Sequence, residues 1–361
     1  MADYLYIHVP FCDSICSYCD FERCKSHPVL RKKWLDAMLS EIKERKETRF
    51  KTIYIGGGTP TSLSCEELEI LLKELQRFHP VEWSVEANIE NLSIEKIHLL
   101  KKQGVNRISL GVQTFQDDLL KKIHRYHSKE MIHEKIKEIH DAGIDNISAD
   151  LIYGLPGQTL EMWMQDLSEI VEDPYVTHLS IYSLTIEENS EFGRNHVVKA
   201  EDELEESMYF TAIDYLEEKG FHQYEISNFA RRQLRSMHNC AYWKYEDFVG
   251  LGCGAYGKED HVYYHHVFRL DTYLKGEDVC EKTALSLQDE RFESIMMGLR
   301  MKEGVDLDDW GKRFSGNLQE IYQYAIQKHI DLNHLEIYDN HLRCTQKGWG
   351  LLNDILIDFM E

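Results

Sequence analysis

The chain has 361 residues, of which 43% are hydrophobic, and its 63 acidic side chains outnumber 41 basic ones, which gives a formal net charge of −22. This length suits two domains of ordinary size, and no stretch approaches the roughly 18 consecutive apolar residues of a membrane-spanning helix. So acidic a surface repels phosphate backbones and argues against general nucleic-acid binding. We therefore expect a soluble, cytoplasmic protein.

Three closely spaced cysteines follow the first apolar run of the chain, residues 4–10. Cys12, Cys16 and Cys19 are separated by three and two residues. Thiolates are the preferred ligands of iron–sulfur clusters and also suit zinc. A structural zinc site, like a four-thiolate cluster, takes four protein ligands. Three ligands would leave one metal corner open for a small molecule.

The residues around these cysteines keep a zinc site as an alternative. Cys24, His8 or His27 could complete a four-ligand site with the three thiols. A disulfide framework is less favoured, because the nine cysteines are an odd number and we see no cationic, apolar leader that would direct the chain to an oxidising compartment. The cysteines alone favour iron–sulfur over zinc without deciding between them.

Short β-type runs alternate with helical patterns from residue 4 to about residue 184. We predict strands at residues 4–10, 51–55, 82–87, 107–112, 146–153 and 178–184. The intervening helices are indicated by an apolar stripe over residues 30–42, a capping box at Ser64 and Glu67, N-caps at Ser93 and Thr159, and helix-ending glycines at Gly104 and Gly143. Such alternation implies parallel strands with right-handed crossovers. Six strand–helix units are too few for a closed eight-fold barrel, so the fold is a partial barrel or an open doubly wound sheet.

Polar or glycine-rich steps end the first five strands. The first strand ends at the cysteine loop, the second at the Gly-Gly-Gly-Thr-Pro of residues 56–60, and the next three near Glu86, Gln113 and Asp150. The carboxyl ends of parallel strands form the ligand face of such folds. The glycines could cradle a small polar ligand or simply form a tight turn, and they lack the Gly-Lys-Ser/Thr ending of a phosphate loop.

These motifs together resemble the radical S-adenosylmethionine (SAM) superfamily. The resemblance rests on Cys-x3-Cys-x-Tyr-Cys after the first strand and Gly-Gly-Thr-Pro after the second. Three longer motifs are typical of one branch, the oxygen-independent coproporphyrinogen III oxidase-like family: Tyr-Ile-His-Val-Pro-Phe-Cys, Arg-Ile-Ser-Leu-Gly-Val-Gln-Thr-Phe and Asp-Leu-Ile-Tyr-Gly-Leu-Pro-Gly-Gln-Thr. The resemblance implies a partial (β/α)6 barrel. It also implies a 4Fe-4S cluster held by Cys12, Cys16 and Cys19, with SAM on the fourth iron.

The same resemblance implies a SAM pocket. Its residues would be Tyr6, Tyr18, Gly57, Gly58, Thr59, Glu86, Gln113, Arg125 and Asp150. Tyr18 would flank the adenine, and the glycine turn would receive the methionine amino end. Acidic groups suit ribose hydroxyls and an ammonium, whereas an arginine suits a carboxylate. One departure from the family is visible at the third strand. The family often has Glu-Ala-Asn-Pro there, whereas residues 86–89 of this chain are Glu-Ala-Asn-Ile.

Two functional classes of this family differ in sequence, and the chain resembles one of them. The dehydrogenases carry a fourth cysteine two residues after the third and a long N-terminal extension, whereas here Phe21 takes that place and 11 residues precede Cys12. Residues 238–243, His-Asn-Cys-Ala-Tyr-Trp, match the His-Asn-x-x-Tyr-Trp motif of HemW-type heme chaperones. We therefore expect a protein that binds heme and a SAM-ligated cluster and passes heme to an apo-hemoprotein. The alternatives are a coproporphyrinogen III dehydrogenase and a zinc-stabilised interaction protein.

The candidate heme residues are His238, Cys240, Tyr242 and Trp243. His, Cys and Tyr can all ligate heme iron, and aromatic rings can pack on a porphyrin face. A buried histidine beside a core Tyr–Trp pair is the plainer interpretation, but the match of the whole motif favours heme. His238 is the expected axial ligand and Cys240 the alternative; Glu225 also matches the family pattern, without an assigned role.

The domain organisation follows from these assignments. We predict a radical SAM core at residues 1–230, a connecting segment with the heme motif at 231–275, and a small winged-helix-like α+β domain at 276–361 that ends in a strand, a cap at Thr345 and a helix. Because no basic stripe is visible, we expect this last domain to be a lid or an interaction domain.

Overall fold

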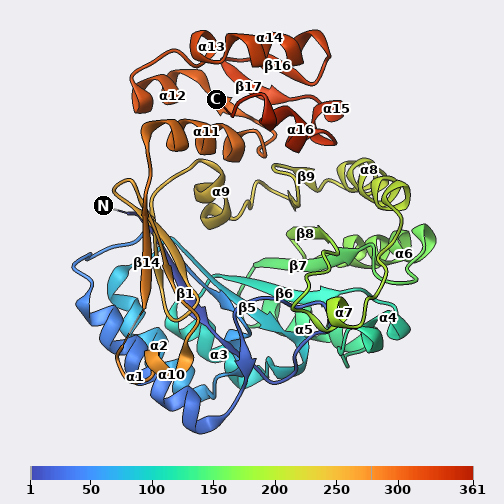
Figure 1. Cartoon of the computed structure of the whole chain (residues 1–361). Coiled ribbons are helices and arrows are strands. Elements are labelled where there is room, and N and C mark those ends of the chain that lie inside the picture. Colours follow the sequence, from blue (N-terminus) through green and yellow to red (C-terminus); the bar gives the residue numbers. More distant parts are fainter. Residues whose placement is uncertain (1, 278, 361) are drawn as a thin grey trace.

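The computed structural model describes residues 2–277 and 279–360 and has the predicted α/β architecture (Figure 1). The six predicted strands are present, lie parallel in chain order, and agree with their predicted bounds to within two residues. They are β1 (Tyr4–Val9), β4 (Thr52–Gly57), β5 (Glu82–Asn88), β6 (Arg107–Gln113), β7 (Asn146–Tyr153) and β8 (His178–Ser183).

Helices cover the outer face of these strands, at the positions that the caps and stripes predict. They are α1 (Pro28–Glu44), α2 (Cys65–Leu75), α3 (Ile94–Gln103), α4 (Asp117–Lys122), α5 (Lys129–Asp141) and α6 (Leu160–Glu172), with short 3-10 turns η1 (Pro60–Ser62), η2 (Gln76–Phe78) and η3 (Ile89–Asn91). Ser64 and Glu67 form the capping box, and Gly104 ends α3 with a φ of 105°. Trp34 and Met38 of α1 are fully buried against the sheet, so the apolar stripe of this helix faces the core.

The sheet extends beyond these strands at both sides, which the sequence did not lead us to expect. Beyond β8 lie β10 (Asn228–Ala230) and β9 (His222–Gln223), and beyond β1 lie β11 (Phe248–Leu251), β12 (Tyr256–Glu259), β13 (Val262–His266) and β14 (Cys280–Ala284). Within the described residues these strands make one open twelve-stranded sheet. β11 pairs in parallel with β1, with Gly250 opposite Tyr6. The first strand of the chain is therefore an interior strand, held between β4 and β11.

Short elements connect the sheet to the site. β2 (Phe11–Cys12) pairs with β3 (Cys24–Lys25) around the cysteine loop. α7 (Glu191–Arg194) and α8 (Asp202–Glu218) follow β8, α9 (Met237–Trp243) contains the heme motif, and α10 (Leu270–Tyr273) precedes β14. Figure 1 shows α9 between the sheet and the C-terminal helices.

The C-terminal residues form a small α+β unit with its own core. Its elements are α11 (Leu287–Gly298), β15 (Val305–Asp306), α12 (Leu307–Phe314), α13 (Leu318–Ile321), α14 (Gln323–Asp331), β16 (Leu335–Tyr338), β17 (His341–Cys344), α15 (Gln346–Trp349) and α16 (Leu352–Ile357). Trp310, Leu342 and Ile355 lie in its core, and Thr345 caps α15 as predicted. In the part of the chain that the structure describes, the helices are too short or too polar to cross a membrane.

Candidate functional site

A cavity of about 470 Å³ lies at the carboxyl ends of the parallel strands. We refer to it as the cluster-side cavity, because Cys12, Cys16 and Cys19 all line it. Eight of the nine residues predicted for SAM also line it: Tyr18, Gly57, Gly58, Thr59, Glu86, Gln113, Arg125 and Asp150. The loop after β1 and the ends of β4 to β7 thus deliver their polar groups to one place, as the strand-end pattern led us to expect.

The cysteine loop fits a metal cluster by its chemistry. All three thiols are free of disulfides, and Thr59 Oγ1 donates to Cys12 Sγ at 3.5 Å. Burial raises the pKa of Cys12 to about 12 and also raises that of Cys19. Buried thiols with raised pKa values remain protonated unless a cation displaces the proton, and cluster iron is such a cation. Ser17 Oγ donates to the Lys122 carbonyl at 3.0 Å and anchors the loop to α4.

The residues that would complete a zinc site lie elsewhere. Cys24 pairs through its backbone with Phe11 in the β2–β3 ladder, and His27 caps α1 by accepting from the Val29 amide. His8 is occupied by hydrogen bonds with the Tyr6 hydroxyl at 3.0 Å and the Glu22 carbonyl at 2.7 Å. Over residues 2–277 and 279–360, no group of three or more His, Cys, Asp and Glu side chains is gathered as a single-ion site. His8 and His27 are thus engaged in other hydrogen bonds.

The glycine turn is required by packing as well as by any ligand. Gly57 has a φ of 109°, and a Cβ atom there would lie 2.8 Å from the His8 ring. A Cβ atom on Gly58 would lie 3.0 Å from Cys12 Sγ. Both contacts are closer than carbon atoms tolerate, so the turn can pack on the cysteine loop because it has no side chains there.

Two half-buried carboxyl groups, those of Glu86 and Asp150, mark one wall of the cluster-side cavity. Burial raises the pKa of Glu86 to about 7, although Glu86 accepts from the Tyr54 hydroxyl at 2.8 Å and from the Gly57 amide at 3.2 Å. Burial also raises the pKa of Asp150, which accepts from Ser109 Oγ at 3.1 Å. Carboxyl groups in such surroundings are suited to hydroxyl and ammonium ligands that replace lost water.

Arg125 and Gln113 reach the same cavity from constrained positions. Arg125 pairs with Glu90 at 2.9 Å and donates to Asn88 Oδ1 at 3.0 Å and to the Gly111 carbonyl at 2.8 Å. A ligand carboxylate would therefore share this guanidinium with Glu90. Gln113 has a φ of 71° at an irregularity in the β6–β7 ladder. Such strained positions are often found where a strand redirects a side chain towards a ligand.

A second cavity, of about 700 Å³, adjoins the first. We refer to it as the aromatic cavity, because rings from the cysteine loop, α9, β11, β12 and β13 line it: Phe21, Tyr242, Trp243, Phe248, Tyr256 and Tyr263. Asp20, Phe21, Gly57 and Glu86 line both cavities. Tyr6 is the one predicted SAM residue that lines the aromatic cavity instead.

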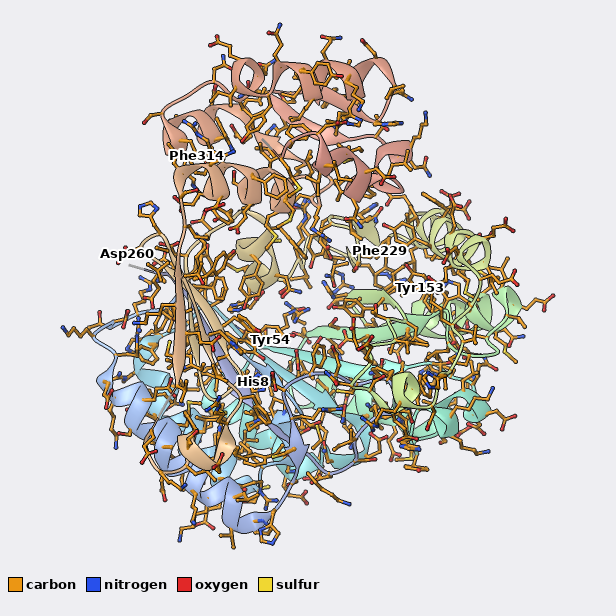
Figure 2. All side chains as sticks on the ribbon, in the orientation of Figure 1. His8, Tyr54, Tyr153, Phe229, Asp260 and Phe314 are labelled. Carbon is orange, nitrogen blue, oxygen red and sulfur yellow. The ribbon has the colours of Figure 1, made fainter. Side chains whose placement is uncertain are left out.

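The histidine of the heme motif lies behind the aromatic cavity. His238 is fully buried; its Nδ1 hydrogen-bonds with the Thr52 hydroxyl at 2.6 Å and its Nε2 with the Tyr242 hydroxyl at 2.8 Å. Its ring stacks on Tyr54 of β4 with centroids 5.2 Å apart. Figure 2 labels Tyr54 on the sheet, near His8 of the neighbouring strand β1. Burial lowers the pKa of His238 to about 3 and raises that of Cys240 to about 11. His238 and Cys240 both line neither cavity.

Several site residues escaped the sequence reasoning. Asn239, the second residue of the heme motif, lines the cluster-side cavity with Tyr54, Ser109 and Tyr182. Period-two spacing from the glycine turn could have indicated Tyr54, because alternate residues of a strand share a face. Glu225 is buried, which raises its pKa to about 7, and it accepts from the Asn228 side chain away from both cavities.

Similarity to known proteins agrees with this arrangement. The chain matches the radical SAM superfamily over residues 6–170 and the HemN C-terminal domain over residues 285–351. It is 34% identical to the heme chaperone HemW of Lactococcus lactis, covering 98% of this chain and 96% of that protein. It is 35% identical to HemW of Bacillus subtilis, covering 98% of both chains.

A solved structure shares the fold. Coproporphyrinogen III oxidase (HemN) from Escherichia coli, a radical SAM enzyme, superposes with a TM-score of 0.86 at 20% identity, covering 99% of this chain and 90% of that one. The likeness establishes a radical SAM fold whose sheet, over the described residues, is open.

Proposed function

The chain belongs to the HemW family of the radical SAM superfamily, and from that membership we propose that it is a heme chaperone, which binds heme and a SAM-ligated 4Fe-4S cluster and transfers the heme to an acceptor protein. The observation that carries the proposal is the end-to-end similarity to HemW heme chaperones, at 34% identity over 96% of one relative and 35% over 98% of another. Two adjoining cavities support it, because they offer separate room for SAM and for heme.

Cys12, Cys16 and Cys19 would hold the cluster and leave its fourth iron to SAM, and the cluster and SAM together would regulate the assembly or loading of heme. The chain's own part is to bind and orient SAM. Glu86 and the backbone of the glycine turn would receive the methionine amino group, and Asp150 a ribose hydroxyl. Arg125 would receive the methionine carboxylate while it keeps its pairing with Glu90.

His238 is the proposed axial ligand of heme iron. Its depressed pKa, about 3, keeps the imidazole neutral at physiological pH, and the neutral imidazole is the form that ligates metals. Because the Tyr242 hydroxyl hydrogen-bonds with Nε2, heme binding must exchange this hydroxyl for iron. Cys240, which is half-buried, would have to turn towards the heme to serve instead.

Anaerobic reconstitution of the cluster followed by titration with hemin tests the proposal. We expect the iron–sulfur absorbance and a heme Soret band on the same chain. His238→Ala should lose the Soret band of the ligated heme, whereas Cys240→Ala should keep it. Equal retention in both variants would contradict the ligand assignment, and a wild-type protein without a Soret band would contradict heme binding.

A second assay separates the chaperone from an enzyme. The likeness to HemN shows a shared fold at 20% identity, so activity has to be measured directly. The protein is incubated anaerobically with coproporphyrinogen III, SAM and dithionite. Formation of protoporphyrinogen at enzymatic rates would overturn the chaperone proposal, and we expect none.

A further inference from the structure

The heme motif serves two cavities. On α9, Asn239 lines the cluster-side cavity, whereas Tyr242 and Trp243, one turn later, line the aromatic cavity. Positions three and four residues apart lie on one face of a helix, so a single helical face passes from one cavity to the other. A motif that served heme alone would not place its asparagine among the residues predicted for SAM.

Another wall of the aromatic cavity comes from β12 and β13, which lie outside the heme motif of residues 238–243. Tyr256 of β12 and Tyr263 of β13 line it, and the Tyr256 ring stacks on His265 with centroids 4.0 Å apart and an angle of 6° between the ring planes. Tyr256 is nevertheless 56% exposed, and Phe21 at the opposite rim is 65% exposed. Large aromatic side chains that stay exposed to solvent around a cavity mark a ligand site more often than a folding core.

The size and the aromatic lining of this cavity suit a flat, largely apolar ligand. Its volume of about 700 Å³ is within the range of cofactor pockets. The Trp243 indole N–H is buried and has no acceptor among the residues that the structure describes. Lys258, the one cationic side chain among the described lining residues, is buried and paired with Asp247 at 2.6 Å. A porphyrin would place its rings between the aromatic walls.

A chain of contacts joins the two cavities. Glu86 lines both and accepts from the Tyr54 hydroxyl at 2.8 Å. The Tyr54 ring stacks on His238, whose Nε2 hydrogen-bonds with the Tyr242 hydroxyl at 2.8 Å. The two ligands would therefore be neighbours with shared protein contacts.

We propose that heme lies in the aromatic cavity, with Tyr242 and Trp243 of α9 in one wall and Tyr256 of β12 and Tyr263 of β13 in another. Asn239 of the same motif contacts SAM. This inference rests on the proposed function and adds to it the place of heme, a wall of the heme site outside the motif, and the division of the motif between two ligands. Any effect of SAM on the heme Kd must be matched by an equal factor of heme on the SAM Kd.

Two variants separate the two ligands. In Tyr256→Leu, hemin titration of the cluster-loaded protein without SAM should give a heme Kd raised about tenfold, because an aromatic wall is lost, and equilibrium dialysis should give a SAM Kd within about twofold of wild type. In Asn239→Ala the SAM Kd should rise about fivefold through loss of one polar contact, and the heme Kd should stay within about twofold of wild type. Both side chains lie at a cavity surface, and cluster iron content and thermal midpoint verify folding.

Tyr338→Leu is the matched control, because Tyr338 is 60% exposed on the C-terminal unit and should change neither Kd. A wild-type heme Kd in Tyr256→Leu, or a raised heme Kd with a wild-type SAM Kd in Asn239→Ala, overturns the inference while leaving heme binding intact. A wild-type protein that binds no hemin overturns the proposed function itself.

Discussion

Removing the Tyr242 hydroxyl should destabilise the heme-free protein and yet strengthen heme binding. This hydroxyl lies 2.8 Å from His238 Nε2, and His238 is 0% exposed. Tyr242→Phe leaves Nε2 without a partner, at a cost of about 1–2 kcal/mol for an unsatisfied buried polar atom. When iron takes Nε2, the wild-type protein gives up this hydrogen bond, whereas the variant has none to lose.

The free energy of heme binding should therefore be more favourable in Tyr242→Phe by about 1–2 kcal/mol, which lowers the heme Kd about 5- to 30-fold. The thermal midpoint of the heme-free variant should fall by a few degrees. Hemin titration at the Soret band and differential scanning calorimetry measure the two effects. Tyr264→Phe is the control: its hydroxyl donates to Glu259 at 3.0 Å, away from the aromatic cavity, so it should leave the heme Kd unchanged. A raised heme Kd in Tyr242→Phe would refute the exchange of Tyr242 for iron.

Four further predictions concern the cluster-side cavity. Cys12→Ala should lose the reconstituted iron and sulfide, and Cys24→Ala should keep both, because Cys24 does not line the cavity. SAM should bind more tightly at pH 8 than at pH 6, because Glu86 has a pKa of about 7 and its ionised form attracts an ammonium; Glu86→Gln should abolish this dependence in equilibrium dialysis. Folding raises the pKa of this carboxyl from 4.5, so its ionisation costs stability as pH rises above that value, and Glu86→Gln should raise the thermal midpoint at pH 8 but not at pH 4. Gly58→Ala should lower the cluster content, because its Cβ atom would lie 3.0 Å from Cys12 Sγ, whereas Gly350→Ala, with its nearest contact at 3.7 Å, should not.

The parallel half of the sheet was predictable because its signals are local. Caps such as Ser64 and Ser93 and helix-ending glycines such as Gly104 fix where each helix begins and ends, and the strands occupy what remains. Strand ends on one edge then follow from parallel pairing. That logic brought Glu86 and Asp150 to one cavity without any knowledge of their contacts.

The aromatic cavity was not predictable in this way, because its walls depend on pairing between distant parts of the chain. β11 carries Gly250, and β12 carries Gly257, where a Cβ atom would come within 2.1 Å of the Tyr264 ring. Glycines weaken a strand pattern, so the sequence alone did not indicate that β11 and β12 are strands. The same register explains Tyr6: it lies opposite Gly250 and lines the aromatic cavity, although its motif suggested SAM.

The interior position of β1 also sets an order of assembly during synthesis. The cysteine loop and the glycine turn are complete once residue 58 is made, but β11, the second neighbour of β1, ends at Leu251. At about 5–20 residues per second, roughly 10–40 s of translation separate the two. For that interval β1 presents an unpaired edge, which invites association with other strands. The wall that carries Tyr256 and Tyr263 follows later still, so a growing chain exposes its cysteine loop before it can enclose a porphyrin.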